Sequence, residues 1–216
     1  KKNLLFDKGS VLYGLDQALE NIRDEDECVL VEGYTDVITA HQFGFKNVIA
    51  SMGTAITIYQ ANKISDISNS VVIALDSDQA GTEATLNALD KSWGVFKSNN
   101  KELPAGITNK VIKKNFMLRI ATLPENHDPD DYIRNSPENW KEIILNASPI
   151  VEYLIESLSK KFDLSTAEGK ELIEEIIRPF ISKEKNPYIQ DQYVSILSKK
   201  LNVSEERIKA GFDTKT

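Results

Sequence analysis

The stretch CVLVEGYTD, residues 28–36, decides the fold because an apolar run ends there in a glutamate and turns at once into a new segment. Such a run predicts a strand buried on both faces, as in a parallel sheet covered by helices. Glu32 follows the run directly, Gly33 permits the turn, and Asp36 opens the next segment. A carboxylate at the end of a buried strand is costly unless positive charge meets it. The stretch therefore predicts an α/β fold with an acidic site at one sheet edge.

Short apolar runs and helical patterns then alternate as far as about residue 135, which is typical of consecutive β–α–β units. Three further strands are predicted at NVIASMG (47–53), VVIALDSD (71–78) and FMLRIATLP (116–124). Beyond residue 135 the segments are amphipathic at the helical period, including a helix SPIVEYLIESLSKKF that Ser148 could cap.

These patterns divide the chain into three parts. Residues 1–27 form a segment that leads into the α/β part. We predict a parallel four-stranded sheet flanked by helices over residues 28–135 and an all-α part over residues 136–216.

Composition narrows the class of protein. The chain has 216 residues, of which 41% are hydrophobic, so it can bury a sizeable core. The formal net charge of -7 argues against a surface laid entirely along nucleic acid. The single cysteine, Cys28, excludes a disulfide framework and a cysteine zinc site. No apolar run reaches the length of a membrane span and the N-terminus lacks a secretory signal, so we expect a cytoplasmic protein.

Pairs of acidic residues follow three of the predicted strands. The carboxyl ends of parallel strands meet at one edge of a sheet, so these pairs are expected to converge. Carboxylates gathered there would repel one another unless they hold hard divalent cations such as Mg²⁺. The pairs are Glu32 with Asp36, Asp76 with Asp78, and Asp128 with Asp130.

A simpler interpretation exists for two of the pairs. Aspartate is a common helix cap, and the sole role of Asp76 or Asp128 could be to cap the helix that follows it. Pro129 and the acids after it are ordinary residues for a first helical turn. This explanation is weaker for Glu32, because a capping residue is not usually the last residue of a strand.

These motifs resemble the toprim domain of the bacterial-type replicative DNA primases. The pattern before the first strand also resembles the segment that precedes toprim in that family, and the all-α part resembles its helical subdomain. The matching segments are EGYTD (32–36), ASMGTA (50–55), LDSDQAG (75–81), DPDDYI (128–133), LFDKGSVLYGLDQA (5–18), LSTAEGKELIEEIIRPFIS (164–182) and YVSILSKKLNVSEERI (193–208).

The resemblance implies roles for individual residues. Glu32, Asp76 and Asp78 would form the metal-binding catalytic centre, extended by Asp128 or Asp130. Whether Glu32 is a metal ligand or a proton acceptor stays open. The resemblance also implies a set of residues for nucleotide and template binding, namely Lys8, Asp36, Gly33, Gly53 and Gly81.

The function implied by the resemblance is DNA-directed synthesis of short RNA primers by a nucleotidyltransferase that uses Mg²⁺ or Mn²⁺. Its partners would be a single-stranded DNA template, ribonucleoside triphosphates and, through a domain that we do not recognise in this chain, the replicative helicase. The family's zinc module cannot be formed with one cysteine and two histidines, so we expect no zinc and a fragment with weak activity or none.

Two other functions stay open at this point. One is a toprim nuclease or topoisomerase-like enzyme, and the other is a recombination scaffold that keeps the fold for binding only. A lysine-bearing insertion from about residue 97 to residue 115 is longer than the family pattern. It either contacts a nucleic-acid backbone or is a solvated surface segment.

Overall fold

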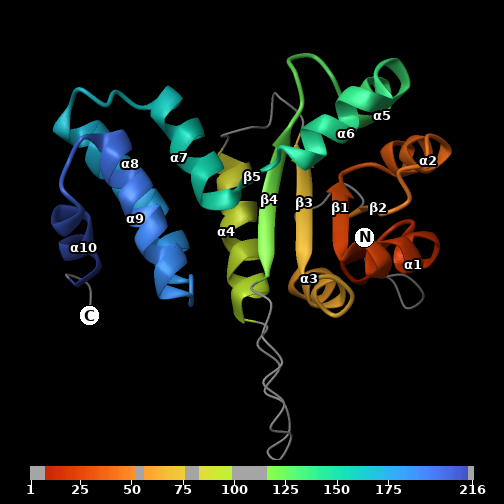
Figure 1. Ribbon diagram of the computed structural model, residues 1–216, viewed down its shortest axis with the longest axis horizontal. Coiled ribbons are helices and arrows are strands. Elements are labelled where there is room, and N and C mark those ends of the chain that lie inside the picture. Colours follow the sequence, from red (N-terminus) through yellow and green to blue (C-terminus); the bar gives the residue numbers. More distant parts are fainter. Residues whose placement is uncertain (1–7, 52–55, 76–82, 99–115, 214–216) are drawn as a thin grey trace, which may run out of the picture.

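The computed structural model describes residues 8–51, 56–75, 83–98 and 116–213. At the centre of the described part is a five-stranded sheet in the order β2-β1-β3-β4-β5 (Figure 1). The first four strands run parallel and β5 is antiparallel to β4. The strands are β1 (Glu27–Val31), β2 (Val48–Ala50), β3 (Ser70–Leu75), β4 (Met117–Thr122) and β5 (Ser148–Pro149).

The predicted α/β class and the four parallel strands are confirmed, while β5 was not predicted. Ser148 was assigned to the start of a helix, but it pairs with Ile120 at the edge of the sheet, and Pro149 pairs with Arg119. Two residues are too few to show a strand period, and proline is tolerated at an edge because it need not donate a ladder hydrogen bond there. The helix that follows begins at Ile150.

One face of the sheet is covered by three helices, α2 (Tyr34–Gln42), α5 (Pro129–Asn135) and α6 (Pro137–Leu145). Alternate strand residues such as Val29 and Val72 pack here with the buried Trp140 of α6. Successive side chains of a strand point to opposite faces, so a strand that is apolar throughout supplies two cores. Through Trp140, helix α6 belongs to the same hydrophobic core as this face of the sheet.

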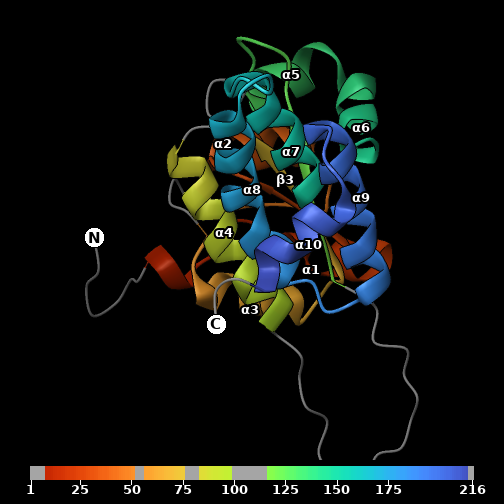
Figure 2. The ribbon, with the colours of Figure 1, turned by 90° about the vertical axis from the view of Figure 1, so that its left-hand side faces the viewer.

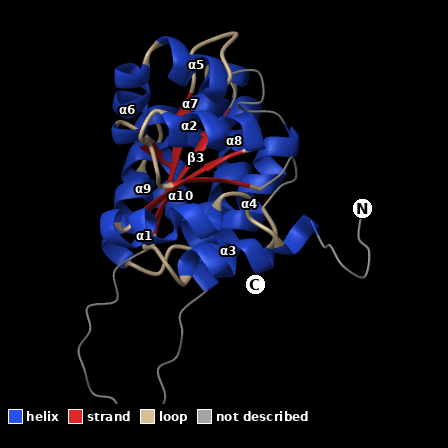
Figure 3. Cartoon of the chain, turned by 90° about the vertical axis from the view of Figure 1, so that its right-hand side faces the viewer, coloured by secondary structure: helices blue, strands red, loops and turns tan. Residues whose placement is uncertain are grey.

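The other face is covered by α1 (Leu15–Glu25), α3 (Ile58–Ser65) and α4 (Glu83–Ser98). The intervening strand residues, such as Leu30 and Ile73, pack against their apolar sides. Figure 3 shows the strands running through the middle of the molecule with helices around them.

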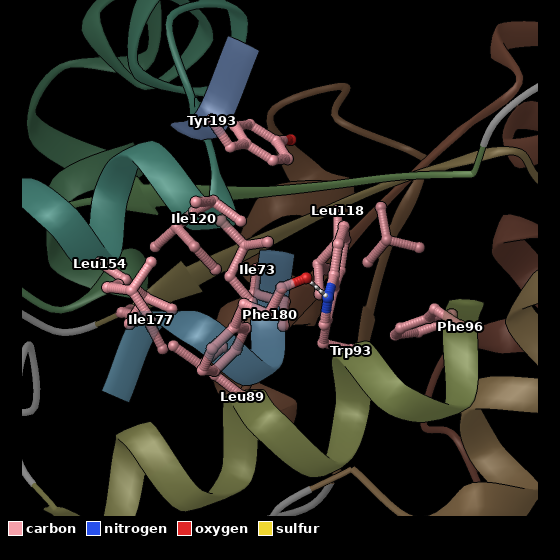
Figure 4. Close-up of a cluster of buried hydrophobic side chains, with 14 of the residues drawn as sticks. Ile73, Leu89, Trp93, Phe96, Leu118, Ile120, Leu154, Ile177, Phe180 and Tyr193 are labelled. Carbon is pink, nitrogen blue, oxygen red and sulfur yellow. Dashed lines mark hydrogen bonds between the residues drawn. The ribbon is translucent and has the colours of Figure 1, made fainter. Parts of the chain in front are cut away.

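Four further helices continue this second core away from the sheet (Figure 1). Trp93 of α4 is 2% exposed, and its Nε1 donates a hydrogen bond of 2.9 Å to the carbonyl oxygen of Phe180 (Figure 4). Lys183 and Asp90 form an ion pair of 2.6 Å beside it. The helices are α7 (Ile150–Lys161), α8 (Ala167–Ser182), α9 (Pro187–Leu201) and α10 (Glu205–Asp213).

The described helices were compared with the length and apolar character of membrane-spanning helices. None of them combines the length and the apolar character that crossing a membrane requires.

Candidate active site at the carboxyl edge of the sheet

Glu32 lies where the first motif predicted it, directly after the last residue of β1. The four strand residues before it are buried, whereas Glu32 is half-buried. Gly33 follows as the N-cap of α2, so the chain turns from strand to helix within two residues. The buried strand thus delivers the Glu32 carboxylate to the sheet edge, where solvent or a cation can reach it.

Asp36 lies in the first turn of α2 and is 7% exposed. Its Oδ2 accepts a hydrogen bond of 2.9 Å from the backbone N–H of Gly33. A Cβ atom on residue 33 would lie 3.0 Å from this oxygen. Glycine at this position therefore makes room for the carboxylate that caps the helix.

The pKa of Asp36 is raised to about 6, chiefly because burial penalises its charged form. The charges of Asp128 and Asp130 raise it further, while the backbone N–H groups of Gly33 and Asp130 act in the opposite direction. The folded chain thus brings carboxylates from two distant segments close enough to affect one another. The strand-end pattern predicted a wider gathering of acids, of which the described residues include this part.

Asp128 is the N-cap of α5, and its Oδ1 accepts a 2.8 Å hydrogen bond from the backbone N–H of Asp131. Asp128 therefore does cap a helix, as the simpler interpretation of this motif predicted. Only Oδ1 is used, and among the described residues no hydrogen bond reaches its Oδ2. The capping bond leaves Asp128, which is exposed, with one carboxylate oxygen for another ligand.

Asp130 is held by side chains from two helices. Its Oδ1 accepts hydrogen bonds from the hydroxyl of Thr39 in α2 and from Nε of Arg134 in α5, the second at 2.8 Å. Arg134 also donates from Nη2 to the Thr39 hydroxyl at 2.8 Å. This network joins α2 to α5 beneath the acidic edge.

Sequence reasoning missed Thr39 and Arg134. Arg134 could have been found, because it lies four residues after Asp130 on a helix and opposite charges at that spacing are neighbours. Thr39 gave no signal. Its hydroxyl meets Asp130 only because α2 and α5 pack together, although 91 residues separate the two positions.

Four predicted site residues, Asp76, Asp78, Gly53 and Gly81, lie outside the described residues. The described strand β3 ends at Leu75 and lies between β1 and β4. Glu32 follows the strand on one side of it. Asp128 follows the strand on the other side after a short connection.

Lys8 lies in a 3₁₀ turn (Lys8–Ser10) that packs against α3. The turn is fixed by side chains at the start of α3: Gln60 donates to the carbonyl of Val11 at 2.7 Å, and the hydroxyl of the N-cap Thr57 donates to the carbonyl of Gly9 at 2.6 Å. Tyr13 forms a bridge with Ala50, the last residue of β2. The segment before the first strand thus runs along the carboxyl end of β2.

The described acids fit hard-cation chemistry but do not form a complete site by themselves. Within the residues that the structure describes, no group of three or more His, Cys, Asp or Glu side chains is arranged to hold a metal ion. The charges of Asp128 and Asp130 help to raise the pKa of Asp36, and carboxylates gathered in this way favour either a proton or a divalent ion. The residue types match the all-oxygen ligation that Mg²⁺ prefers.

Comparison with known proteins identifies two family patterns in the chain. Residues 26–101 match the Toprim domain, and residues 151–206 match the DnaB-helicase binding domain of primase. The DNA primase of Clostridium acetobutylicum is 34% identical over 206 residues, which cover 94% of this chain and 31% of that protein. The chain belongs to the bacterial-type DNA primases.

Solved primase structures share the fold of this chain. A DNA primase domain from Pseudomonas aeruginosa is 28% identical with a TM-score of 0.74, covering 98% of this chain and 62% of that one. A DnaG primase catalytic domain bound to ssDNA is 26% identical with a TM-score of 0.74, covering 92% of this chain and 59% of that one. The chain spans about a third of the length of the curated primases that it matches.

One expectation about the primase family was wrong. No helicase-binding part was recognised in the sequence, yet the match to the DnaB-helicase binding domain covers α7, α8 and α9. The amphipathic patterns of these helices are explained by their shared core. Because burial alone accounts for such patterns, they gave no sign of a surface for a partner.

Proposed function

We propose that this chain is the catalytic-core part of a DNA primase, a DNA-directed RNA polymerase that makes short primers by metal-dependent nucleotidyl transfer. The observation that carries the proposal is that the charges of Asp128 and Asp130 act on Asp36, which caps the helix directly after Glu32. The names of the relatives support primer synthesis rather than the nuclease, topoisomerase-like or scaffold functions.

The proposed metal ligands are Glu32, Asp76 and Asp78, extended by Asp128 or Asp130. When bound, Mg²⁺ or Mn²⁺ would stabilise the attacking 3′ oxygen and the leaving pyrophosphate of an in-line displacement. Asp128 and Asp130 each make their side-chain hydrogen bonds through Oδ1. Within the described residues neither Oδ2 accepts a hydrogen bond, so each of these oxygens can bind a cation or a water bound to one.

The remaining residues of the site would orient these ligands. Asp36 caps α2 and so fixes the turn that presents Glu32. In this proposal Glu32 either binds the metal or accepts the proton of the attacking hydroxyl, and its half-buried position suits both roles. Lys8 and the motif glycines Gly33, Gly53 and Gly81 belong to the proposed nucleotide and template contacts.

The proposed partners are a single-stranded DNA template, ribonucleoside triphosphates and the replicative helicase, in a cytoplasmic setting. The template is supported by the related DnaG catalytic domain, whose structure contains bound ssDNA. The helicase is supported by the family match over residues 151–206, and we place its proposed contact on these residues.

Glu32→Gln in a full-length primase carrying this sequence tests the proposal. The amide keeps the size of the side chain but removes the charge that a metal ligand or proton acceptor needs. We expect primer synthesis to fall by about 100-fold or more, the scale of losing a positioned acid or base. The readout is incorporation of labelled ribonucleotides on a single-stranded template.

The matched control is Glu168→Gln, the same change at an exposed glutamate in the first turn of α8. It should leave primer synthesis near the unmodified rate. Near-normal synthesis by a folded Glu32→Gln enzyme would contradict the assigned metal centre.

A further inference from the structure

A groove of about 1100 Å³ lies between the end of the sheet and the helices α7 and α9. Its wall on the sheet side includes Thr122, the last residue of β4, and Glu125 from the connection that leads to Asp128. The groove thus starts three residues along the chain from the acidic edge. In Figure 1, α7 rises from β5 beside the upper part of the sheet, and α9 lies next to it in Figures 1 and 2.

Four lysines line the far part of the groove, in two adjacent pairs. Lys160 and Lys161 end α7, and Lys199 and Lys200 lie in the last turn of α9. Lysine at a helix C-terminus complements the helix dipole, which accounts for one pair on each helix taken alone. The dipole does not account for both pairs facing a single groove.

Three glutamates also line the groove. Glu156 is already paired with two of the lysines, with Lys200 at 2.5 Å and Lys160 at 3.8 Å. The hydrogen bond and charge of Lys200 lower the pKa of Glu156, which therefore stays ionised. Glu125 and Glu152 line the end nearer the sheet.

Lys161 and Lys199 are the lysines that remain available. Both are exposed, and neither forms an ion pair with any residue in the described part of the chain; the Lys161 ammonium lies 5.8 Å from the centre of the Phe162 ring. Between them and the sheet, the wall includes the half-buried side chains of Tyr153 and Ile196. The groove therefore combines a partly apolar wall with two cations at its rim.

We propose that this groove binds a single nucleic-acid strand, with phosphates on Lys161 and Lys199 and sugars or bases against Tyr153 and Ile196. Phosphate contacts by lysine supply most of the sequence-independent affinity for nucleic acid, and aromatic faces accept any base. The inference rests on the proposed function in one respect, because the strand would be the template or the primer. It assigns that strand a path from the acidic edge over the helical part.

The test is equilibrium binding of fluorescein-labelled oligodeoxythymidylate and oligouridylate by this chain and by its Lys161→Ala, Lys199→Ala double variant. Each phosphate contact contributes about 0.7 to the slope of log affinity against log salt for a single strand. The double variant should lose about 1.4 of that slope. From about 50 to 200 mM salt the unmodified chain should therefore lose about sevenfold more affinity than the variant. The two oligonucleotides report whether a DNA or an RNA strand is preferred.

The control variant is Lys46→Ala with Lys185→Ala. Both residues are exposed, one before β2 and the other before the start of α9, at the far end from Lys199. Removing the same charge there should leave the slope unchanged. An unchanged slope in the Lys161 and Lys199 variant, or equal losses in both variants, would overturn the proposal.

Two further outcomes separate this inference from its alternatives. Binding is measured with a chelator and without nucleotides, so it does not depend on the metal centre, and a failure of primer synthesis would leave the groove result standing. If the Lys161 and Lys199 variant binds oligonucleotide normally but loses binding to the replicative helicase, the groove is a protein interface and the nucleic-acid proposal is wrong.

Discussion

At the scale of single residues, Asp36 shows why this sheet edge needs a cation or a proton. Its carboxyl group is buried, lies near two other carboxylates and has a pKa raised to about 6. In the unfolded chain the same group would titrate near 3.8. The native state therefore holds a proton between about pH 4 and pH 6 that the unfolded state has released, and unfolding becomes easier as pH rises through that window.

Asp36→Asn should remove this pH dependence. Asparagine can still accept the hydrogen bond from Gly33 but carries no charge. The variant should gain stability over the unmodified chain as pH rises from about 4 to about 6, by as much as about 3 kcal/mol, and the difference should stay constant above pH 6. Urea unfolding in a chelator, measured at several pH values, gives the difference. A constant difference across this range would contradict the assigned pKa shift.

At the scale of elements, the acidic edge depends on how α2 meets α5. Thr39 is fully buried between them and bonds to both Asp130 and Arg134. The hydroxyl therefore sets the position of α5, and with it the position of Asp128 at the helix N-terminus. A buried polar network of this kind is costly when one member is lost, because the other members keep no partner.

Thr39→Val tests this coupling, since valine has nearly the same shape but no hydroxyl. We expect unfolding free energy to fall by about 1–3 kcal/mol, the cost of leaving buried polar groups unsatisfied. In a full-length primase, primer synthesis should fall as well. The control is Thr35→Val on the exposed side of the same helix, for which little change is expected. Equal effects of the two substitutions would show that the hydroxyl does not set the position of α5.

At the scale of the whole molecule, the sheet and the helical part share one continuous core. Strand residues such as Ile73 belong to the same cluster as Leu154 of α7 and Ile177 of α8 (Figure 4). The hydrogen bond from Trp93 to Phe180 joins the sheet-covering helix α4 to α8 inside that cluster. The helices are therefore expected to unfold together with the sheet rather than as a separate unit.

Trp93→Phe should weaken this connection. It removes the donor from a buried carbonyl and leaves a smaller ring, so unfolding free energy should fall by about 2–4 kcal/mol. Trp140→Phe is the matched control, because Trp140 is equally buried but its indole makes no hydrogen bond with the described residues. The difference between the two losses, measured by denaturant unfolding, isolates the hydrogen bond. A single coincident transition seen by far-UV circular dichroism and by fluorescence would support one cooperative unit.

Local patterns were sufficient for most of the fold. The apolar runs at CVLV and VVIAL identified strands buried on both faces, because only such strands lack alternation, and the position of Glu32 follows from where the first run ends. The strand-end rule also predicted that Asp36, Asp128 and Asp130 converge, since parallel strands place their carboxyl ends together.

The sequence by itself determined the α/β class, the four parallel strands and the position of Glu32 directly after the first of them, because these depend on residue type and on periods of two and 3.6 along the chain. Only the tertiary structure decided the short antiparallel β5, the Thr39 contact and the lysine groove between α7 and α9. Each of these joins residues far apart in the chain, and such pairings depend on packing between elements, which no local period records.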